Sequence, residues 1–189
     1  MRRWTKVKWS EARQVAEAMG LAEEERPGEG LAPEAWYAEI VSAGDLERAA
    51  SLIGHALPRY ESVAWAARQL EAQSHVRKLP ARDQQALDRA LRWLDEPTDE
   101  FRRETFEAAE QASEDSAERM LANAVFLSGG SIAPADLNPV SPLPELSGRF
   151  AVSAVLIAAH RSADAPAALK DALASAEAIA VQGLVPSGP

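Results

Sequence analysis

The chain has no cysteine among its 189 residues, so disulfide frameworks and cysteine-based metal or redox centres are excluded. A reducing, cytoplasmic location fits this composition and is the one we expect. The longest apolar stretch, residues 150–159, is about half of what spans a bilayer, so no transmembrane segment is expected. The basic N-terminus is not followed by an apolar stretch, which argues against a signal peptide.

Basic side chains are outnumbered by acidic ones, 20 to 29, which gives a net charge of -9. A surface that follows a nucleic-acid backbone needs the opposite sign, so no nucleic acid is expected as a partner. The one basic stretch is an N-terminal arm, residues 1–9, which also carries Trp4 and Trp9. This arm either folds onto the body of the protein or contacts an anionic partner or lipid surface.

Alanine is abundant and β-branched residues are scarce, a composition that favours helices. Apolar periodicity, prolines and cap residues predict helices at these places: Ser10 to Gly20, Pro33 to Gly44, after Asp45, Pro58 to His75, after Pro80, after Thr98, over 117–125, over 150–159 and after Pro166.

One of these segments, residues 150–159, is apolar on nearly every side, which predicts a buried central helix. The expected fold is therefore all-α, an irregular bundle of about eight or nine helices around that buried helix. We expect the arm at 1–9, a single helical domain at 10–182 and a C-terminal tail at 183–189.

Catalytic signatures are missing from the sequence. None of the three histidines, His55, His75 and His160, belongs to a metal-binding or catalytic motif. Each lies near a predicted helix end, where an imidazole can bond the last carbonyls. We therefore assign no catalytic, cofactor-binding or metal-binding residue, and expect no enzymatic activity.

A proline-rich connection, residues 128–147, carries Gly129 and Gly130 near its start. A phosphate-binding loop places its glycines before a helix, but these follow one, where the helix dipole repels anions. A left-handed helix stop is therefore favoured over a ligand cradle. Pro139 and Pro142 form a minimal PxxP, and a stiff crossover between helices is favoured over a ligand motif.

Carboxylates around Pro97 are the candidates for acid–base or metal chemistry. They are Asp95, Glu96, Asp99, Glu100 and Glu104. Two of them could bind a hard cation or act as acid and base, while solvated helix caps are the favoured alternative. An enzyme of this kind would bring several of them together in a cleft with shifted pKa values.

Aromatic side chains that lie off the apolar stripes of their helices are candidates for a protein-binding surface. Trp65 is one: either its helix buries two faces, which is favoured because tryptophan is usually buried, or Trp65 is exposed. Nearby arginines suit the same kind of surface, or intrahelical pairs such as Arg103 with Glu107. The candidate interaction residues are Trp65, Arg68, Arg59, Arg102, Phe106, Phe126, Gly129 and Gly130.

Four segments occur in a familiar order: residues 57–68, 93–102, 126–134 and the apolar helix from Phe150. Together they resemble an uncharacterised family of small bacterial all-helical proteins associated with type VI secretion gene clusters. The resemblance runs from about residue 45 to 182 and implies a biological setting, with no established activity or catalytic residue. The chain departs from the family pattern at Ala64 and Ala66, beside Trp65, and at Leu127, where that family often has further aromatic residues.

The leading hypothesis is a non-enzymatic protein-interaction module, such as an adaptor, chaperone or accessory protein of a type VI secretion system. Its partner is expected to be a protein. Two alternatives stay open: a small carboxylate- or divalent-metal-dependent enzyme, and an immunity-type neutralising protein whose acidic face mimics a substrate. The last alternative requires one continuous negative patch.

Overall fold

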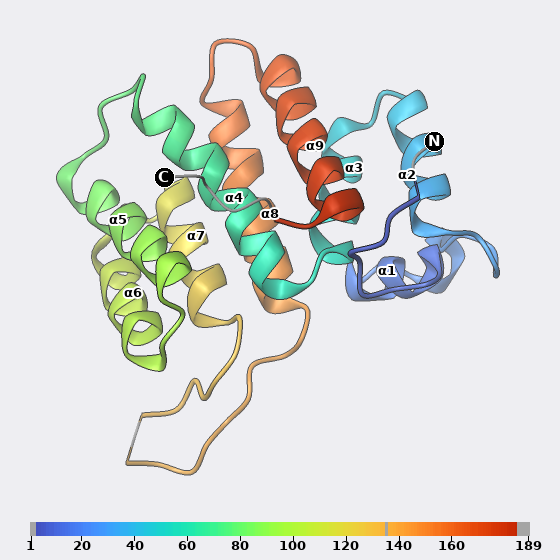
Figure 1. Ribbon diagram of the computed structural model, residues 1–189. Helices are drawn as coiled ribbons and strands as arrows, with labels where there is room; N and C mark the ends of the chain where they lie inside the picture. The colour runs from blue at the N-terminus through green and yellow to red at the C-terminus, as the bar shows by residue number, and fades with distance from the viewer. Residues whose placement is uncertain (1–2, 135, 185–189) are drawn as a thin grey trace.

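The computed structural model describes residues 3–134 and 136–184 (Figure 1). Within these ranges the chain forms nine α-helices and one short 3-10 helix, with no strand, which confirms the all-α prediction. The elements are α1 (Ala12–Ala18), η1 (Glu23–Glu25), α2 (Pro33–Ser42), α3 (Leu46–Ala56), α4 (Arg59–Ser74), α5 (Ala81–Asp95), α6 (Asp99–Gln111), α7 (Ala117–Phe126), α8 (Leu146–His160) and α9 (Ala165–Gln182). No helix in the described ranges is both long enough and apolar enough to cross a bilayer.

Helix α8 occupies the centre of the bundle, as its all-round apolar sequence predicts. It packs against α3, α4, α7 and α9, which cover it on different sides. Helices α5, α6 and α7 form one group, and α1, α2, α3 and α9 lie on the opposite side of α4 and α8 (Figure 1). Alanines line many of these contacts, so the helix backbones come close together.

Side-chain caps set several of the helix starts. Asp45 accepts a hydrogen bond from the Arg48 backbone N–H at 3.0 Å, and the Thr98 hydroxyl accepts one from Phe101 at 3.2 Å. Each of these side chains satisfies a first-turn N–H that has no partner inside its helix. The predicted cap at Ser10 is wrong by one residue, because Gln14 Oε1 accepts from the backbone N–H of Ser10 and Glu11, and Glu11 becomes the cap.

Gly54 of α3 packs tightly against side chains of two neighbouring helices. A Cβ at this position would overlap the Val152 side chain and lie 3.1 Å from the Trp65 ring. The Gly54 carbonyl also accepts a hydrogen bond from the Ser62 hydroxyl at 2.9 Å. A residue without a side chain is therefore needed where α3 meets both α4 and α8.

A buried ion pair ties the end of α8 to the start of α7. Glu118, which is fully buried, accepts hydrogen bonds of 2.9 and 2.6 Å from Arg161. The Arg161 Nε donates to Gln73 Oε1 of α4 at 2.9 Å. This forked geometry satisfies both carboxylate oxygens and offsets the loss of hydration on burial.

The N-terminal arm folds onto the body, the first of its two predicted alternatives. Trp4 is buried, and its ring contacts that of Tyr37 at a centroid distance of 5.1 Å. The backbone N–H groups of Thr5 and Lys6 donate to the Ala180 carbonyl at 3.0 and 2.9 Å. Residues 1–2 of the predicted arm and 185–189 of the predicted tail lie outside the described residues.

Replacing Gly54 by alanine should lower the free energy of unfolding by about 1–3 kcal/mol, because the new methyl group overpacks the junction of three helices. The matched control is Gly148→Ala in α8, where a Cβ would meet its neighbours at 3.4 Å or more. Urea denaturation of both variants measures the difference. Equal stability of the two variants would contradict the close approach at Gly54.

Candidate functional site

Arg102 of α6 is buried at the end of α7. Its Nη1 donates to the Phe126 carbonyl at 2.7 Å, and its Nη2 donates to the Ser131 carbonyl at 2.8 Å. The Nε and Nη2 groups also donate to Asp99 Oδ1 at 2.9 and 2.6 Å. One guanidinium therefore satisfies a free carbonyl at the end of a helix, fixes the chain beyond it, and is neutralised by a carboxylate.

Two further arginines fix the same stretch of chain. Arg103 donates to the carbonyls of Ser131 and Ala133, each at 3.2 Å, and Arg59 of α4 donates to the Ser128 carbonyl at 3.2 Å. We call Arg59, Arg102 and Arg103 the arginine anchor. Hydrogen bonds from Arg102 and Arg103 hold the pKa of Asp99 below its usual value, so the carboxylate stays charged beside them.

Aromatic stacking and a left-handed glycine complete the anchor. The rings of Phe106 and Phe126 stack with centroids 4.1 Å apart, and the Arg102 guanidinium lies 4.8 Å from the Phe126 centroid. Gly130 has a φ of 65°, and a Cβ there would lie 2.8 Å from Arg102 Nη2. The chain thus turns sharply against Arg102 at a residue that has no side chain.

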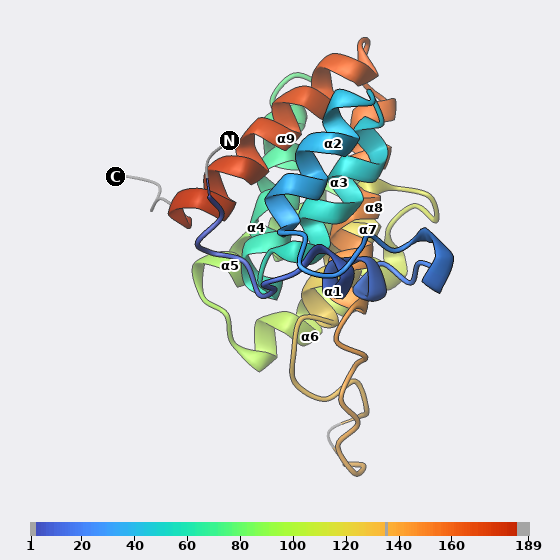
Figure 2. The ribbon, with the colours of Figure 1, turned by 90° about the vertical axis from the view of Figure 1, so that its right-hand side faces the viewer.

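The segment held by the arginine anchor is the connection between α7 and α8, which we call the 128–145 loop. It extends away from the helical body in both ribbon views (Figures 1 and 2). The Ile132 N–H donates to the Val140 carbonyl at 2.8 Å, and Ser131 Oγ accepts from the N–H groups of Ala133 and Val140. These bonds close the outer part of the loop on itself, which gives it an internal framework.

Large apolar side chains are exposed along this loop. Leu143, Leu137 and Val140 are 60%, 59% and 49% exposed, and Ile132 is 37% exposed. Only three other large hydrophobic side chains in the described part of the chain are exposed, and they are scattered over other elements: Val41, Tyr60 and Val76. Exposed apolar groups concentrated in one projecting segment are characteristic of binding surfaces.

Most of the sequence-predicted interaction residues belong to the arginine anchor or lie beside it. Five of them come together as described: Arg59, Arg102, Phe106, Phe126 and Gly130. Gly129 precedes Gly130 in the chain, and nothing lies within 4 Å of a Cβ added to it. Their role differs from the expectation, because Arg102 and Phe126 are buried and act from inside to hold the loop. The intrahelical pair predicted for Arg103 forms with Asp99 and not with Glu107.

Two predicted residues lie elsewhere. Trp65 is fully buried, and its indole N–H donates to the Ala172 carbonyl of α9 at 2.8 Å. Its helix buries two faces, which is the favoured alternative, so the assignment of Trp65 to an interaction surface is wrong. Arg68 lies further along α4 and is half-buried.

The carboxylates around Pro97 do not assemble into a metal-binding group. Asp99 is held by Arg102 and Arg103, and Glu104 pairs with Arg89. Among the described residues, no group of three or more histidine, aspartate or glutamate side chains could hold a metal ion.

The exposed loop residues are the functional candidates that the sequence interpretation missed. Ile132, Leu137, Val140 and Leu143 are apolar residues within a proline-rich, non-helical segment, where no amphipathic stripe accounts for them. Such a combination indicates exposed apolar side chains, because residues in a loop are not placed on a helix face that packs against the core. Pro142 of the PxxP pattern is buried, in keeping with the favoured crossover reading.

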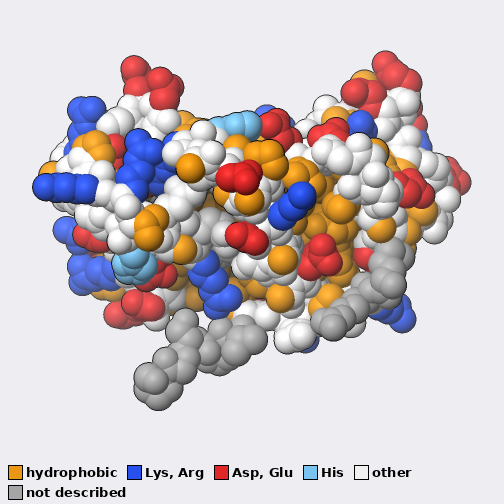
Figure 3. Space-filling view, turned by 90° about the horizontal axis from the view of Figure 1, so that it is seen from above, with side chains coloured by type: hydrophobic (Ala, Val, Ile, Leu, Met, Phe, Trp, Pro, Cys, Tyr) orange, Lys and Arg blue, Asp and Glu red, His pale blue; other side chains and the backbone are white. Residues whose placement is uncertain are grey.

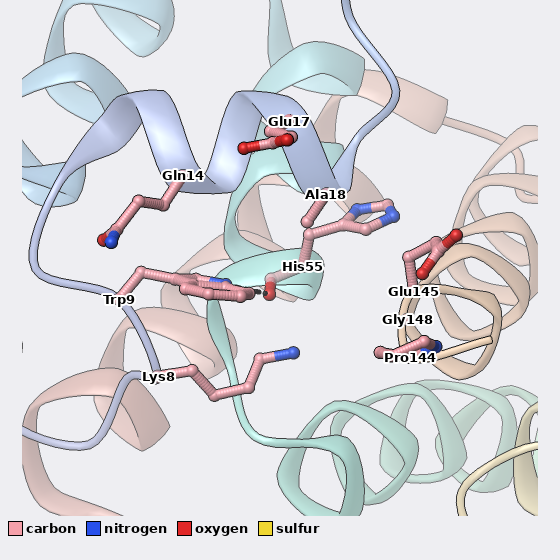
Figure 4. Close-up of a pocket in the computed structure, with 9 residues that line it drawn as sticks. All are labelled: Lys8, Trp9, Gln14, Glu17, Ala18, His55, Pro144, Glu145 and Gly148. Carbon is pink, nitrogen blue, oxygen red and sulfur yellow. Dashed lines mark hydrogen bonds between the residues drawn. The ribbon is translucent and has the colours of Figure 1, made fainter.

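A separate pocket of about 470 Å³ lies where the arm, α1, the end of α3 and the start of α8 meet (Figure 4). Its polar lining comes from Lys8, Gln14, Glu17, His55 and Glu145, beside the ring of Trp9. The Trp9 indole N–H donates to the His55 carbonyl at 3.2 Å, which fixes the ring at the pocket.

His55 is buried in the wall of this pocket in its neutral form. Its Nδ1 lies 2.8 Å from the Ser51 carbonyl, and because a carbonyl only accepts, Nδ1 carries the proton. The Nε2 lone pair has no hydrogen-bond partner among the described residues. Burial, and to a smaller extent the nearby charges of Lys8 and Arg149, lower the pKa of His55, while the Ser51 bond and Glu145 oppose the shift.

Comparison with known proteins yields one family. A family model described as a family of unknown function (DUF6931) matches residues 36–180. No curated protein and no solved structure matches the chain. The 128–145 loop and the arginine anchor lie inside the matched range, whereas Lys8, Trp9, Gln14 and Glu17 lie outside it.

Replacing Gly130 by alanine should loosen the loop. The substitution combines a left-handed backbone, which costs a non-glycine residue about 1–2 kcal/mol, with an overlap against Arg102. Gly129→Ala is the matched control, since nothing lies within 4 Å of its added Cβ. Limited proteolysis should cleave the loop faster in Gly130→Ala only, and equal cleavage of both variants would contradict the anchored geometry.

The stability of the protein should fall as the pH is lowered from 7 to 5. The folded pKa of His55 lies below its unfolded value of 6.5. As the pH falls, the unfolded chain therefore takes up a proton first, and this stabilises the unfolded state relative to the folded one. The slope due to one such group is at most about 1.4 kcal/mol per pH unit. His55→Asn should flatten the dependence in urea melts over this range, and an unchanged slope would contradict the neutral buried imidazole.

Proposed function

The chain belongs to this family of unknown function (DUF6931), and from that premise we propose that it is a non-enzymatic protein-interaction module that presents the 128–145 loop to a protein partner. The observation that supports the proposal is the exposure of Ile132, Leu137, Val140 and Leu143 on a segment that three arginines hold in place.

The energetics of such a loop favour binding. Fully burying a leucine side chain contributes about 1.5–3 kcal/mol, and more than half of this contribution is not used within the isolated chain at Leu137 and Leu143. Ordering a loop on binding opposes association, and a loop that is already fixed at its base loses less conformational entropy. The arginine anchor and the Ile132–Val140 hydrogen bond therefore supply pre-organisation.

The biological setting of the proposal is a bacterial type VI secretion system, in which the protein would serve as an adaptor, chaperone or accessory factor. This part rests on the resemblance of residues 57–68, 93–102 and 126–134 to proteins of such gene clusters. All three segments lie within the range matched by the family.

The two alternatives receive less support from the arrangement of charge. Asp99 and Glu104, which an acid–base or metal site would use, are each paired with arginines. An immunity-type protein needs a continuous acidic face, whereas acidic and basic side chains are interspersed over the face seen in Figure 3. A module that binds through apolar contacts needs neither feature.

The proposal is tested by removing the apolar character of the loop. We expect Val140→Asp combined with Leu143→Asp to reduce cross-linking to the partner in native cells by more than tenfold, because each buried aspartate forfeits an apolar contact and needs desolvation. Val76→Asp is the matched control, since Val76 is 87% exposed and belongs to the turn after α4.

Quantitative mass spectrometry of the cross-linked partners measures the result. A partner encoded with the secretion apparatus that is lost in the loop variant and kept in Val76→Asp supports both parts of the proposal. A partner that is kept in the loop variant contradicts the role of the loop. Loss of a partner unrelated to secretion would leave the interaction role intact and overturn the setting.

A further inference from the structure

The pocket beside His55 contains hydrogen-bond donors and acceptors in about equal measure. The Lys8 ammonium is a donor, and the carboxylates of Glu17 and Glu145 are acceptors. Within the described part of the chain, none of these three groups forms an ion pair. Gln14 uses its Oε1 at the start of α1, which leaves the two amide N–H groups of the same side chain as further donors.

This mixture selects the chemistry of a ligand. An anion that approached Lys8 would also meet the carboxylates of Glu17 and Glu145, and a cation that approached those carboxylates would meet Lys8. A hydroxyl group both donates and accepts, so it can pair with every polar group in the lining without a net charge. A ligand with several hydroxyls is therefore the best match.

The aromatic part of the lining adds a flat apolar surface. The Trp9 ring has the Lys8 ammonium 5.4 Å from its centroid, and Figure 4 shows the ring between Lys8 on one side and Gln14 and Glu17 on the other. The face of an indole carries partial negative charge, which attracts the slightly positive C–H groups on one face of a sugar ring. Hydroxyls at the edge of such a ring would then point toward the polar side chains around Trp9.

We propose that this pocket binds a neutral polyhydroxylated ring, that is, a mono- or disaccharide. The ring stacks on the face of Trp9 that the Lys8 ammonium does not cover, and its hydroxyls bond Lys8, Gln14, Glu17 and Glu145. The volume of about 470 Å³ is within the range of small-molecule sites. The pocket borders the inner end of the 128–145 loop through Pro144 and Glu145, but its lining includes none of the exposed apolar residues of that loop, so either assignment can fail without the other.

The test follows the indole N–H of Trp9 in 1H–15N correlation spectra of the full chain. Titration with D-glucose, D-galactose, N-acetyl-D-glucosamine and maltose, each to about 50 mM, covers the weak affinities expected of a few exposed hydrogen bonds. We expect at least one sugar to shift this signal in a saturable manner. Glucose 6-phosphate, titrated in parallel, reports on the competing class of phosphorylated ligands.

Matched variants locate the site. Glu17→Gln and Glu145→Gln should each weaken binding about tenfold, because a hydrogen bond to a charged acceptor is stronger than one to a neutral amide. Glu39→Gln on the exposed face of α2 is the control and should leave the affinity unchanged. The proposal is overturned if no neutral sugar shifts the Trp9 signal, if only the phosphorylated sugar binds, or if the two pocket variants bind as the control does.

Discussion

Burial of α8 is the main constraint on how the helices pack. Its sequence is apolar on nearly every side, so the hydrophobic effect favours neighbouring helices around most of it, and α3, α4, α7 and α9 supply them. Close packing is possible because the contacts use glycine and alanine, with Gly54 at the tightest point. The chain that connects α8 to α7 projects from the end of the bundle (Figure 2).

The second constraint is the need to satisfy backbone carbonyls where α7 ends. The last carbonyls of a helix have no partner within it, and buried ones must find a donor elsewhere. Arg102 donates to one of them, the Phe126 carbonyl, and its own buried charge is balanced by Asp99. The same guanidinium holds the Ser131 carbonyl, so the termination of a helix and the placement of the loop result from one set of hydrogen bonds.

Local features of the sequence account for most of what could be predicted. Asp45 and Thr98 cap helices through bonds to residues three positions away, so their roles follow from short-range pattern alone. Trp65 bonds a carbonyl that is 107 residues distant, and the choice between its two possible environments depends on how α4 and α9 pack. Arg103 lies four residues after Asp99 and four before Glu107 in the same helix, so the sequence offers two partners. The Ser131 and Ala133 carbonyls favour the rotamer that reaches Asp99. The pocket could not be predicted either, because Lys8, Glu17 and Glu145 converge from three separate elements.

The arginine anchor separates the tip of the loop from the rest of the fold. The bonds that fix the start of the loop to the body end at Ala133, and further out Val140 bonds Ser131 and Ile132 of the loop itself. Substitutions at the tip therefore leave the contacts of the helical bundle unchanged, and the tip can vary while the scaffold stays the same.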